Sequence, residues 1–129
     1  MAPIVKPTAS ELEILDILWE KRKATVSEVH KALDERRPTA YTTALKFMQI
    51  MLEKGMVRRD ETDRAHVYRP AVTQKQTQKN LVSDLLDKAF RGSALKLVQH
   101  VLETKPATRE ELAAIREIIR EAEERETKK

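Results

Sequence analysis

The spacing of the apolar residues changes twice along this chain, and these two changes constrain the fold more than any other feature. Up to about residue 54 the apolar side chains recur every three or four positions, which is the period of amphipathic helices. Over residues 56–69 they alternate with polar side chains in two short runs, as in a β-hairpin. The helical period returns from residue 73 onward. The sequence therefore predicts a mainly α fold with one small β-hairpin.

Three helices are expected before the hairpin, because each has its own start or stop signal. Thr8 and Thr25 each stand three residues before a glutamate, which is the capping-box pattern of a helix N-terminus. Pro38 ends the second helix, since proline disfavours helical geometry in the residue before it. The third helix is predicted to run from about Thr39 to Lys54, and the glycine that follows suits the left-handed position after a helix.

The third predicted helix has two chemically different faces. One is apolar and is expected to pack against the rest of the domain: Tyr41, Ala44, Leu45, Met48, Met51 and Leu52. The opposite face is polar and is expected to meet solvent: Thr39, Thr42, Thr43, Lys46 and Glu53. The third helix therefore has a polar face that is free to bind a partner.

The order helix, helix, helix, hairpin is typical of a winged helix-turn-helix domain. In that fold the exposed face of the third helix enters the major groove of DNA, and the hairpin, or wing, lies beside it. On the third helix we expect base-reading and positioning residues: Thr39, Thr42, Thr43 and Lys46. On the wing we expect phosphate contacts: Arg58, Arg59, Arg64 and His66. The alternative is that three of these residues are ordinary solvent-facing residues: Thr42, Thr43 and His66.

The distribution of charge favours nucleic acid as the partner. The net charge is +4, and residues 36–69 carry all of it, with eight basic and four acidic side chains. A local excess of basic charge is expected where a protein contacts the phosphate backbone, although an ordinary solvated face can have the same composition. The competing interpretation is a winged-helix protein-interaction module, whose affinity would not depend on ionic strength.

The helical segments after residue 73 predict a dimerisation arm. Gly92 ends a long helix, and Ser93 and Thr108 are placed to cap two further helices. The chain is too short to bury three apolar faces alone, so a second copy would cover them by two-fold packing; folding back onto the winged domain is the alternative. The expected dimer contacts are Leu81, Leu85, Leu86, Phe90, Val98, Val101, Leu102, Leu112, Ile115 and Ile119. Residues 1–72 would then bind DNA and residues 73–129 would pair two copies on a palindromic operator.

Several classes of function are excluded by what the chain lacks. Without cysteine it has no disulfide, thiolate zinc site or cysteine nucleophile, and its three histidines show no ligand spacing, so we expect no metal or cofactor. Ser93 and Lys96 fit the Ser-x-x-Lys pattern of penicillin-reactive enzymes, but the partner motifs are missing, so we expect no enzyme activity. No signal-peptide core or run of about 20 apolar residues occurs, which predicts a soluble cytoplasmic protein.

The ordered set of segments resembles the penicillinase-repressor family of the BlaI and MecI type. The similar segments extend from about residue 8 to residue 121 and include residues 11–19, 24–30, 40–45, 54–59, 64–70 and 90–93. No single segment is diagnostic, but their order is specific. The resemblance implies a homodimer that represses β-lactamase, penicillin-binding-protein or related operons, and that is cut in its arm when a membrane sensor protease detects antibiotic. It also implies DNA contacts by Thr42, Thr43, Lys46 and Arg64.

The chain departs from that family's pattern in three places. The family's cleavage pair is Asn-Phe, and the corresponding pair here is His100-Val101, so the resemblance does not carry cleavage over. The copper-responsive branch has a cysteine cluster near its C-terminus, which this chain lacks, and copper release by that route is excluded. Asp63 replaces the usual wing glycine, which we expect to alter the turn without removing the wing.

Overall fold

The protein forms two compact units that divide after Asp84, inside a long helix. The computed structural model describes residues 6–62 and 64–128. The altered wing turn predicted at Asp63 therefore lies outside the described residues. So do the first five residues, for which the sequence predicts no signal peptide. The boundary predicted after residue 72 marks the end of the wing and stays a prediction. None of the described helices is long and apolar enough to cross a membrane.

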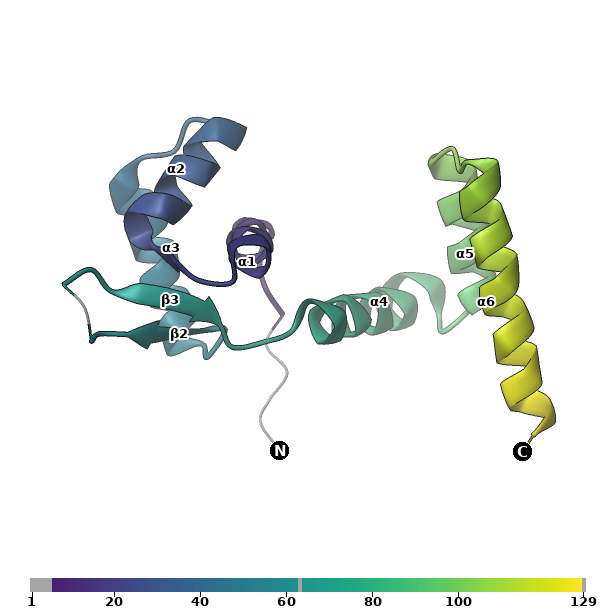
Figure 1. The fold of residues 1–129 in the computed structure, drawn as a ribbon. Coiled ribbons are helices and arrows are strands. Elements are labelled where there is room, and N and C mark those ends of the chain that lie inside the picture. The colour runs from purple at the N-terminus through teal and green to yellow at the C-terminus, as the bar shows by residue number, and fades with distance from the viewer. Residues whose placement is uncertain (1–5, 63, 129) are drawn as a thin grey trace. The chain divides into compact units, whose positions relative to one another are not determined.

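The first unit contains helices and a small sheet, and the second is helical (Figure 1). In chain order the elements of the first unit are α1 (Ala9–Lys21), β1 (Ala24–Thr25), α2 (Val26–Arg36), α3 (Tyr41–Glu53), β2 (Val57–Asp60) and β3 (Val67–Pro70). They are followed by α4 (Gln74–Phe90), which contains the division, and by α5 (Ala94–Thr104) and α6 (Arg109–Thr127).

The first two helices begin at the predicted capping boxes. The hydroxyl of Thr8 accepts a hydrogen bond from the Glu11 N–H at 3.2 Å, and the Glu11 carboxylate accepts one from the Thr8 N–H at 2.9 Å. Thr25 and Glu28 repeat this exchange at the start of α2. Each box satisfies two backbone donors that the helix itself leaves without a partner, so the prediction of both N-termini is confirmed.

The sheet has three antiparallel strands in the order β1-β3-β2, where the sequence predicted only a two-stranded hairpin. The missing strand, β1, pairs Ala24 with Tyr68 and Thr25 with Val67. It is too short to show an alternating pattern, and its partner lies far along the chain. On β3 the fully buried side chain is Tyr68, whereas Val67 is only half-buried.

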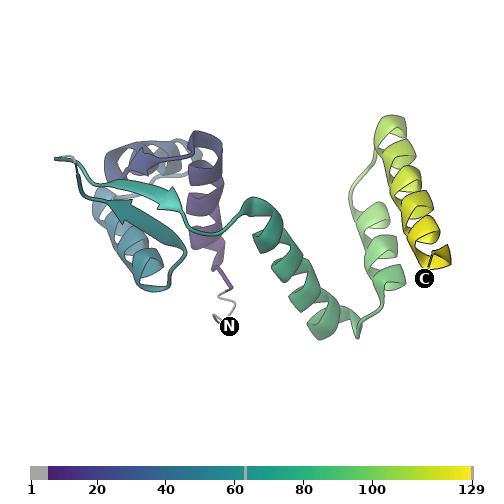
Figure 2. The same cartoon turned by 60° about the horizontal axis from the view of Figure 1, so that its bottom comes forward.

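The core of the first unit lies between the three helices and one face of the sheet (Figure 2). Its fully buried side chains include Ile14, Leu15 and Leu18 of α1, Val29 of α2, Met48 and Met51 of α3, and Val57 and Tyr68 of the sheet. Trp19 packs against this core, and its indole N–H donates a hydrogen bond to the carbonyl of Val72 at 2.9 Å. This bond fixes the chain between the wing and α4 to the first helix.

Tyr41 corrects the predicted packed face of α3. Its side chain is 44% exposed, whereas Ala44, one turn later, is fully buried. The helical period places Tyr41 on the apolar side, but the first turn of α3 extends past the core. The Tyr41 ring instead lies edge-on to His30, with ring centroids 5.6 Å apart and an interplanar angle of 81°. The tyrosine is therefore available at the surface.

The second unit has the predicted helix breaks and very little burial. The Ser93 hydroxyl accepts the Lys96 N–H at 3.2 Å, and the Thr108 hydroxyl accepts the Glu111 N–H at 3.0 Å, so both caps are confirmed. Gly92 has a φ of +79°, which suits a glycine. Neither α5 nor α6 has a fully buried side chain among its described residues. The apolar side chains of these two helices are therefore left largely open to solvent.

Candidate nucleic-acid interface

Helix α3 presents the predicted reading residues to solvent. Thr42, Thr43 and Lys46 are all exposed, within the first two turns of the helix. The N-terminal part of a recognition helix is the part that reaches base edges, and small hydroxyls permit close approach to them. The geometry therefore suits the predicted role of these three residues, which stays a prediction.

The turn before α3 is held by side chains of α2. A ring nitrogen of His30 lies 2.7 Å from the Thr39 carbonyl oxygen, and the Asp34 carboxylate accepts the Thr39 N–H at 2.9 Å. The Thr39 hydroxyl donates to the carbonyl of Arg37 at 2.8 Å. Thr39 thus has a structural role in the turn and is half-buried. Its predicted contact with DNA would require this hydroxyl to exchange or share its partner.

The wing places its basic side chains on two different surfaces. Arg58 and Arg59 are neighbours on β2 and point to opposite faces of the sheet, because side chains alternate along a strand. Arg59 forms an ion pair with Glu61, and its side chain is only 30% exposed. A hydrogen bond with Tyr68, and then the contacts with Glu61, raise the pKa of Arg59 above its ordinary value. Arg59 is therefore charged and held in place.

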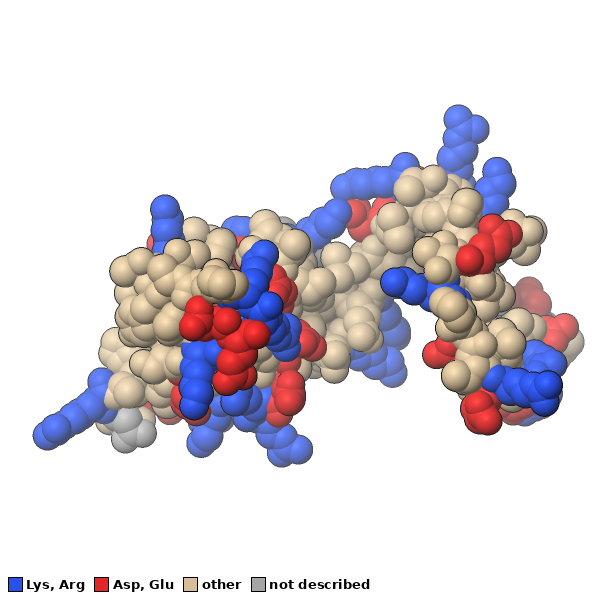
Figure 3. Space-filling model, turned by 90° about the horizontal axis from the view of Figure 1, so that it is seen from above, with Lys and Arg blue, Asp and Glu red and all other residues tan. Residues whose placement is uncertain are grey.

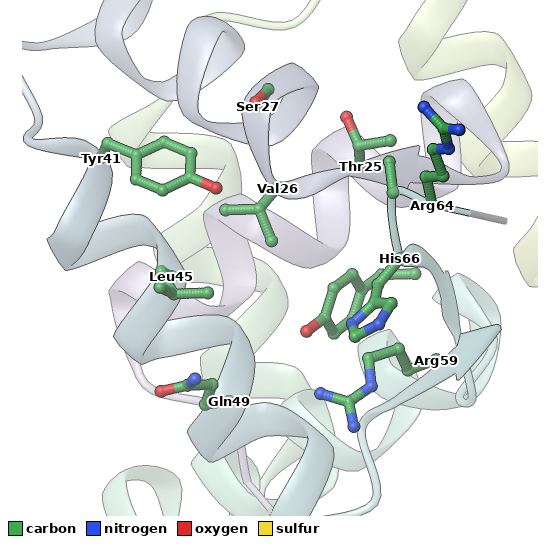
Figure 4. Close-up of a pocket in the computed structure, with 11 residues that line it drawn as sticks. Thr25, Val26, Ser27, Tyr41, Leu45, Gln49, Arg59, Arg64 and His66 are labelled. Carbon is green, nitrogen blue, oxygen red and sulfur yellow. The ribbon is translucent and has the colours of Figure 1, made fainter. Parts of the chain in front are cut away.

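A groove of about 360 Å³ lies between α3, the start of α2 and the wing (Figure 4). It brings together three of the predicted wing residues, Arg59, Arg64 and His66, and leaves Arg58 outside its lining. Two residues of α3 that the sequence analysis did not assign to the interface, Tyr41 and Gln49, form its opposite side. The remaining lining residues are Thr25, Val26, Ser27, Leu45, Ala65 and Tyr68.

The sequence gives different signals for Tyr41 and Gln49, the two groove residues that were not predicted. The helical period assigned Tyr41 to the packed face. Gln49 is polar and exposed, and its position three residues after Lys46 was a usable signal for the solvent face. The groove itself depends on residues from three separate parts of the chain, which no local pattern brings together.

The basic segment of residues 36–69 is not one continuous surface, which corrects the simplest interpretation of its charge. Arg36 pairs with Asp16 at 2.9 Å and Arg37 with Glu13 at 2.7 Å, so both arginines bind the side of α1. Lys54 pairs with the buried carboxylate of Glu11 at 2.9 Å. One face of the first unit accordingly shows basic and acidic side chains side by side (Figure 3). The basic residues of this segment that do not pair with α1 are those of α3 and the wing.

The serine that fits an enzyme motif is part of a helix cap. The hydroxyl of Ser93 accepts the backbone N–H of Lys96, as an N-cap residue does. Among residues 6–62 and 64–128, no three histidine, aspartate or glutamate side chains gather as a metal site requires.

Comparison with known proteins gives one consistent family. The family described as penicillinase repressor matches residues 7–121 of the chain. The transcriptional regulator BlaI of Mycobacterium tuberculosis is 33% identical over 125 residues, which covers 95% of this chain and 89% of that protein. The penicillinase repressor of Bacillus licheniformis is 22% identical over 121 residues and covers 94% of each chain. The methicillin resistance regulatory protein MecI of Mammaliicoccus sciuri is 19% identical, covering 87% of this chain and 91% of its own.

A solved structure supports the fold of the first unit. The solution structure of the DNA-binding domain of the repressor BlaI has a TM-score of 0.51 and 23% sequence identity, and it covers 57% of this chain and 90% of that domain. The predicted fold class, mainly α with a winged helix domain and a helical arm, is confirmed.

Proposed function

The chain belongs to the penicillinase-repressor family, and on that premise we propose that it represses transcription as a homodimer bound to a palindromic operator. That it is a DNA-binding transcriptional repressor, and not an enzyme, follows from the family. The two-fold assembly, the palindrome and the residues that touch DNA are the parts proposed here.

The arrangement of α3 beside the wing carries the proposal for DNA contact. Thr42, Thr43 and Lys46 are exposed on α3, and Arg64 and His66 line the groove on its wing side. A helix of this kind fits the major groove, and the cations beside it fit the phosphates that flank that groove. Hydroxyls and a lysine on the helix, with arginines on the wing, match this division between base and backbone contacts.

The exposed apolar side chains of the second unit support the proposal of a dimer. Val101 and Ile119, both among the predicted dimer contacts, are 52% and 51% exposed. Leu95 and Ile118 are also exposed, and we add them to the proposed contact surface. An apolar surface of this kind is unfavourable in water and is typical of a protein–protein interface. The alternative, in which the arm packs on its own winged domain, requires a monomer.

The names of the relatives support a proposal for the regulated genes. Because they include a penicillinase repressor and a methicillin resistance regulatory protein, we extend the proposal to β-lactam-resistance or related genes. A membrane sensor protease is then a candidate partner, acting on a repressor that binds DNA in the cytoplasm. His100 and Val101 of α5 are both exposed.

The experiment that tests this function is selection of genomic DNA fragments by the purified protein at two salt concentrations. We expect enrichment of a short palindrome, and an affinity that falls steeply with salt, because each phosphate contact contributes about 0.9 to the logarithmic salt slope. Loss of enrichment at both salt concentrations would contradict operator binding and favour the protein-interaction module.

The assignment of α3 is tested with Lys46→Ala. This variant is expected to bind the selected operator on the order of tenfold more weakly while remaining a dimer. Lys31→Ala, which removes another exposed lysine from α2, is the matched control and should bind normally. Equal operator affinity of the two variants would contradict the assignment of α3 to the DNA interface.

A further inference from the structure

We infer that the groove between α3 and the wing holds one phosphodiester of the DNA backbone, with Tyr41 on its helix side and Arg59 on its wing side. The inference rests on the proposed function and adds to it a defined anion site and a residue, Tyr41, that the sequence placed in the core. It also separates Arg59 from its neighbour Arg58, although the sequence predicts phosphate contact for both.

The composition of the groove selects an anion. Among the described residues, the 11 that line the groove include no acidic side chain, although acidic residues make up 21 of the 129 in the chain. Two arginines and a histidine project from the wing, and hydroxyl groups come from Thr25, Ser27 and Tyr41. Cations and hydroxyl donors together are the usual ligands of phosphate oxygens.

The apolar part of the groove favours a phosphodiester over a free anion. Val26, Leu45 and Tyr68 also line it, so apolar surface lies next to the charged groups. A phosphodiester carries a deoxyribose on each side of its charged oxygens, and these sugars can cover such a surface. The groove also separates the helix that we place in the major groove from the wing, which is where a DNA strand must pass if both elements bind one duplex.

The two proposed ligands are held in position before DNA binds. Arg59 has Tyr68 and Glu61 as partners, and a guanidinium has five N–H donors, so donors remain for a phosphate. Tyr41 is held edge-on by His30, which itself contacts the Thr39 carbonyl. In Figure 4 the Tyr41 ring extends from α3 with its hydroxyl towards the space beside Val26, and Arg59 extends from the wing towards Gln49. Groups that are already ordered lose less entropy on binding.

The first test compares Arg59→Gln with Arg69→Gln on the selected operator. Both changes remove one charge from the wing, but Arg69 does not line the groove. We expect Arg59→Gln to lower the salt slope by about 0.9 and Arg69→Gln to leave it nearly unchanged. Thermal unfolding of both variants checks that the wing is intact. Equal slopes for the wild type and Arg59→Gln would overturn the inference.

The second test locates the phosphate. Operator duplexes in which one phosphate at a time is replaced by a neutral methylphosphonate are bound by the wild type and by Arg59→Gln. We expect one position per half-site that weakens the wild type but not the variant. Tyr41→Phe should lose about tenfold in affinity, and equally on every operator sequence, because a hydroxyl that bonds a phosphate reads no base. A uniform methylphosphonate profile for both proteins would rule the groove out as the phosphate site.

A third measurement separates the DNA backbone from a free anion. Inorganic phosphate is titrated into the full-length protein and into Arg59→Gln, with the operator as competitor. Displacement of the operator from the wild type but not from Arg59→Gln, at a phosphate concentration too low to act through ionic strength, would show that both ligands use the groove and would support the inference. Phosphate that binds the wild type but not Arg59→Gln, and yet leaves the operator bound, would assign the groove to a free anion and overturn the inference. If the wild type selects no operator at all, the proposed function fails, and the groove is then not a DNA site.

Discussion

At the scale of single residues, the backbone of Arg22 carries the clearest local strain. Arg22 ends α1 with a φ of 73° and a ψ of −37°, and its N–H donates to the Leu18 carbonyl at 2.6 Å. A side chain with a Cβ atom rarely adopts a positive φ, and glycine adopts it readily. The end of α1 is therefore built on a conformation that its own residue disfavours.

We predict that Arg22→Gly stabilises the first unit. Relief of the strain should exceed the entropy that glycine loses on folding, for a net gain of about 0.5–1 kcal/mol in the free energy of unfolding. Thermal unfolding should show a rise of a few degrees. Lys23→Gly, at the next position, where φ is not positive, is the control and should not stabilise. A lower unfolding temperature for Arg22→Gly would contradict the strain argument.

A second residue, Asp34, is predicted to position α3 without touching DNA. Its carboxylate accepts the Thr39 N–H, so Asp34→Ala leaves this donor without its partner and should cost about 1 kcal/mol of stability. Because the turn sets where α3 begins, operator affinity should fall several-fold at a temperature at which the protein is folded. Asp34→Asn keeps an acceptor oxygen and should restore affinity. If Asp34→Ala loses stability but binds the operator normally, the turn does not position the helix.

At the scale of elements, local signals predicted the helices and failed where distant segments meet. Thr8 and Thr25 identify helix starts because a capping box is complete within four residues. Strand β1 has no such signal, since Ala24 and Thr25 become a strand only by pairing with β3. The groove at the interface was missed for the same reason. The wing arginines were identified from composition. Composition alone did not show which of them faces α3.

An ion pair joins the first helix to the end of the third. The Glu11 side chain is only 3% exposed and accepts hydrogen bonds from the Thr8 N–H and from Lys54, at the end of α3. Burial alone would raise the pKa of Glu11, but the hydrogen bonds from Thr8 and the contacts with Lys54 together lower it below its ordinary value of 4.5. The ionised carboxylate is therefore the form that stabilises the fold.

This shift predicts how stability depends on pH. A carboxyl whose pKa is lower in the folded state contributes stability above its unfolded pKa and loses it as the pH falls through the folded value. The wild type should therefore lose stability below about pH 4.5, and Glu11→Gln should be less stable at pH 7 by about 1–3 kcal/mol, with a flatter acid limb. Urea unfolding between pH 3 and pH 7 measures both. Glu35→Gln, at an exposed position of α2, is the control. If the stability of Glu11→Gln fell with acid as steeply as that of the wild type, Glu11 would not be the cause of the acid dependence.

At the scale of the whole molecule, the chain divides its apolar residues between two uses. In the first unit they are buried in one core between α1, α2, α3 and the sheet. In α5 and α6 they remain exposed, and none of the described side chains there is fully buried. The first unit therefore has a buried core of its own, whereas the second exposes an apolar surface that the proposed partner would cover. A second copy is the simplest partner for a family that represses transcription, since one half-site per copy makes a palindrome.

Ile119→Asp tests whether the arm pairs two copies of the chain. A charge placed in the proposed interface should separate the dimer, because a buried carboxylate without a partner costs several kcal/mol. Sedimentation should then show a monomer, and affinity should fall on the full palindrome but not on an isolated half-site. Ala113→Asp adds the same charge at an exposed position about 120° around α6 from Ile119, outside the apolar stripe, and should remain a dimer. A dimeric Ile119→Asp would place the interface elsewhere. A monomer that kept full affinity for the palindrome would show that pairing is not what holds this repressor on its operator.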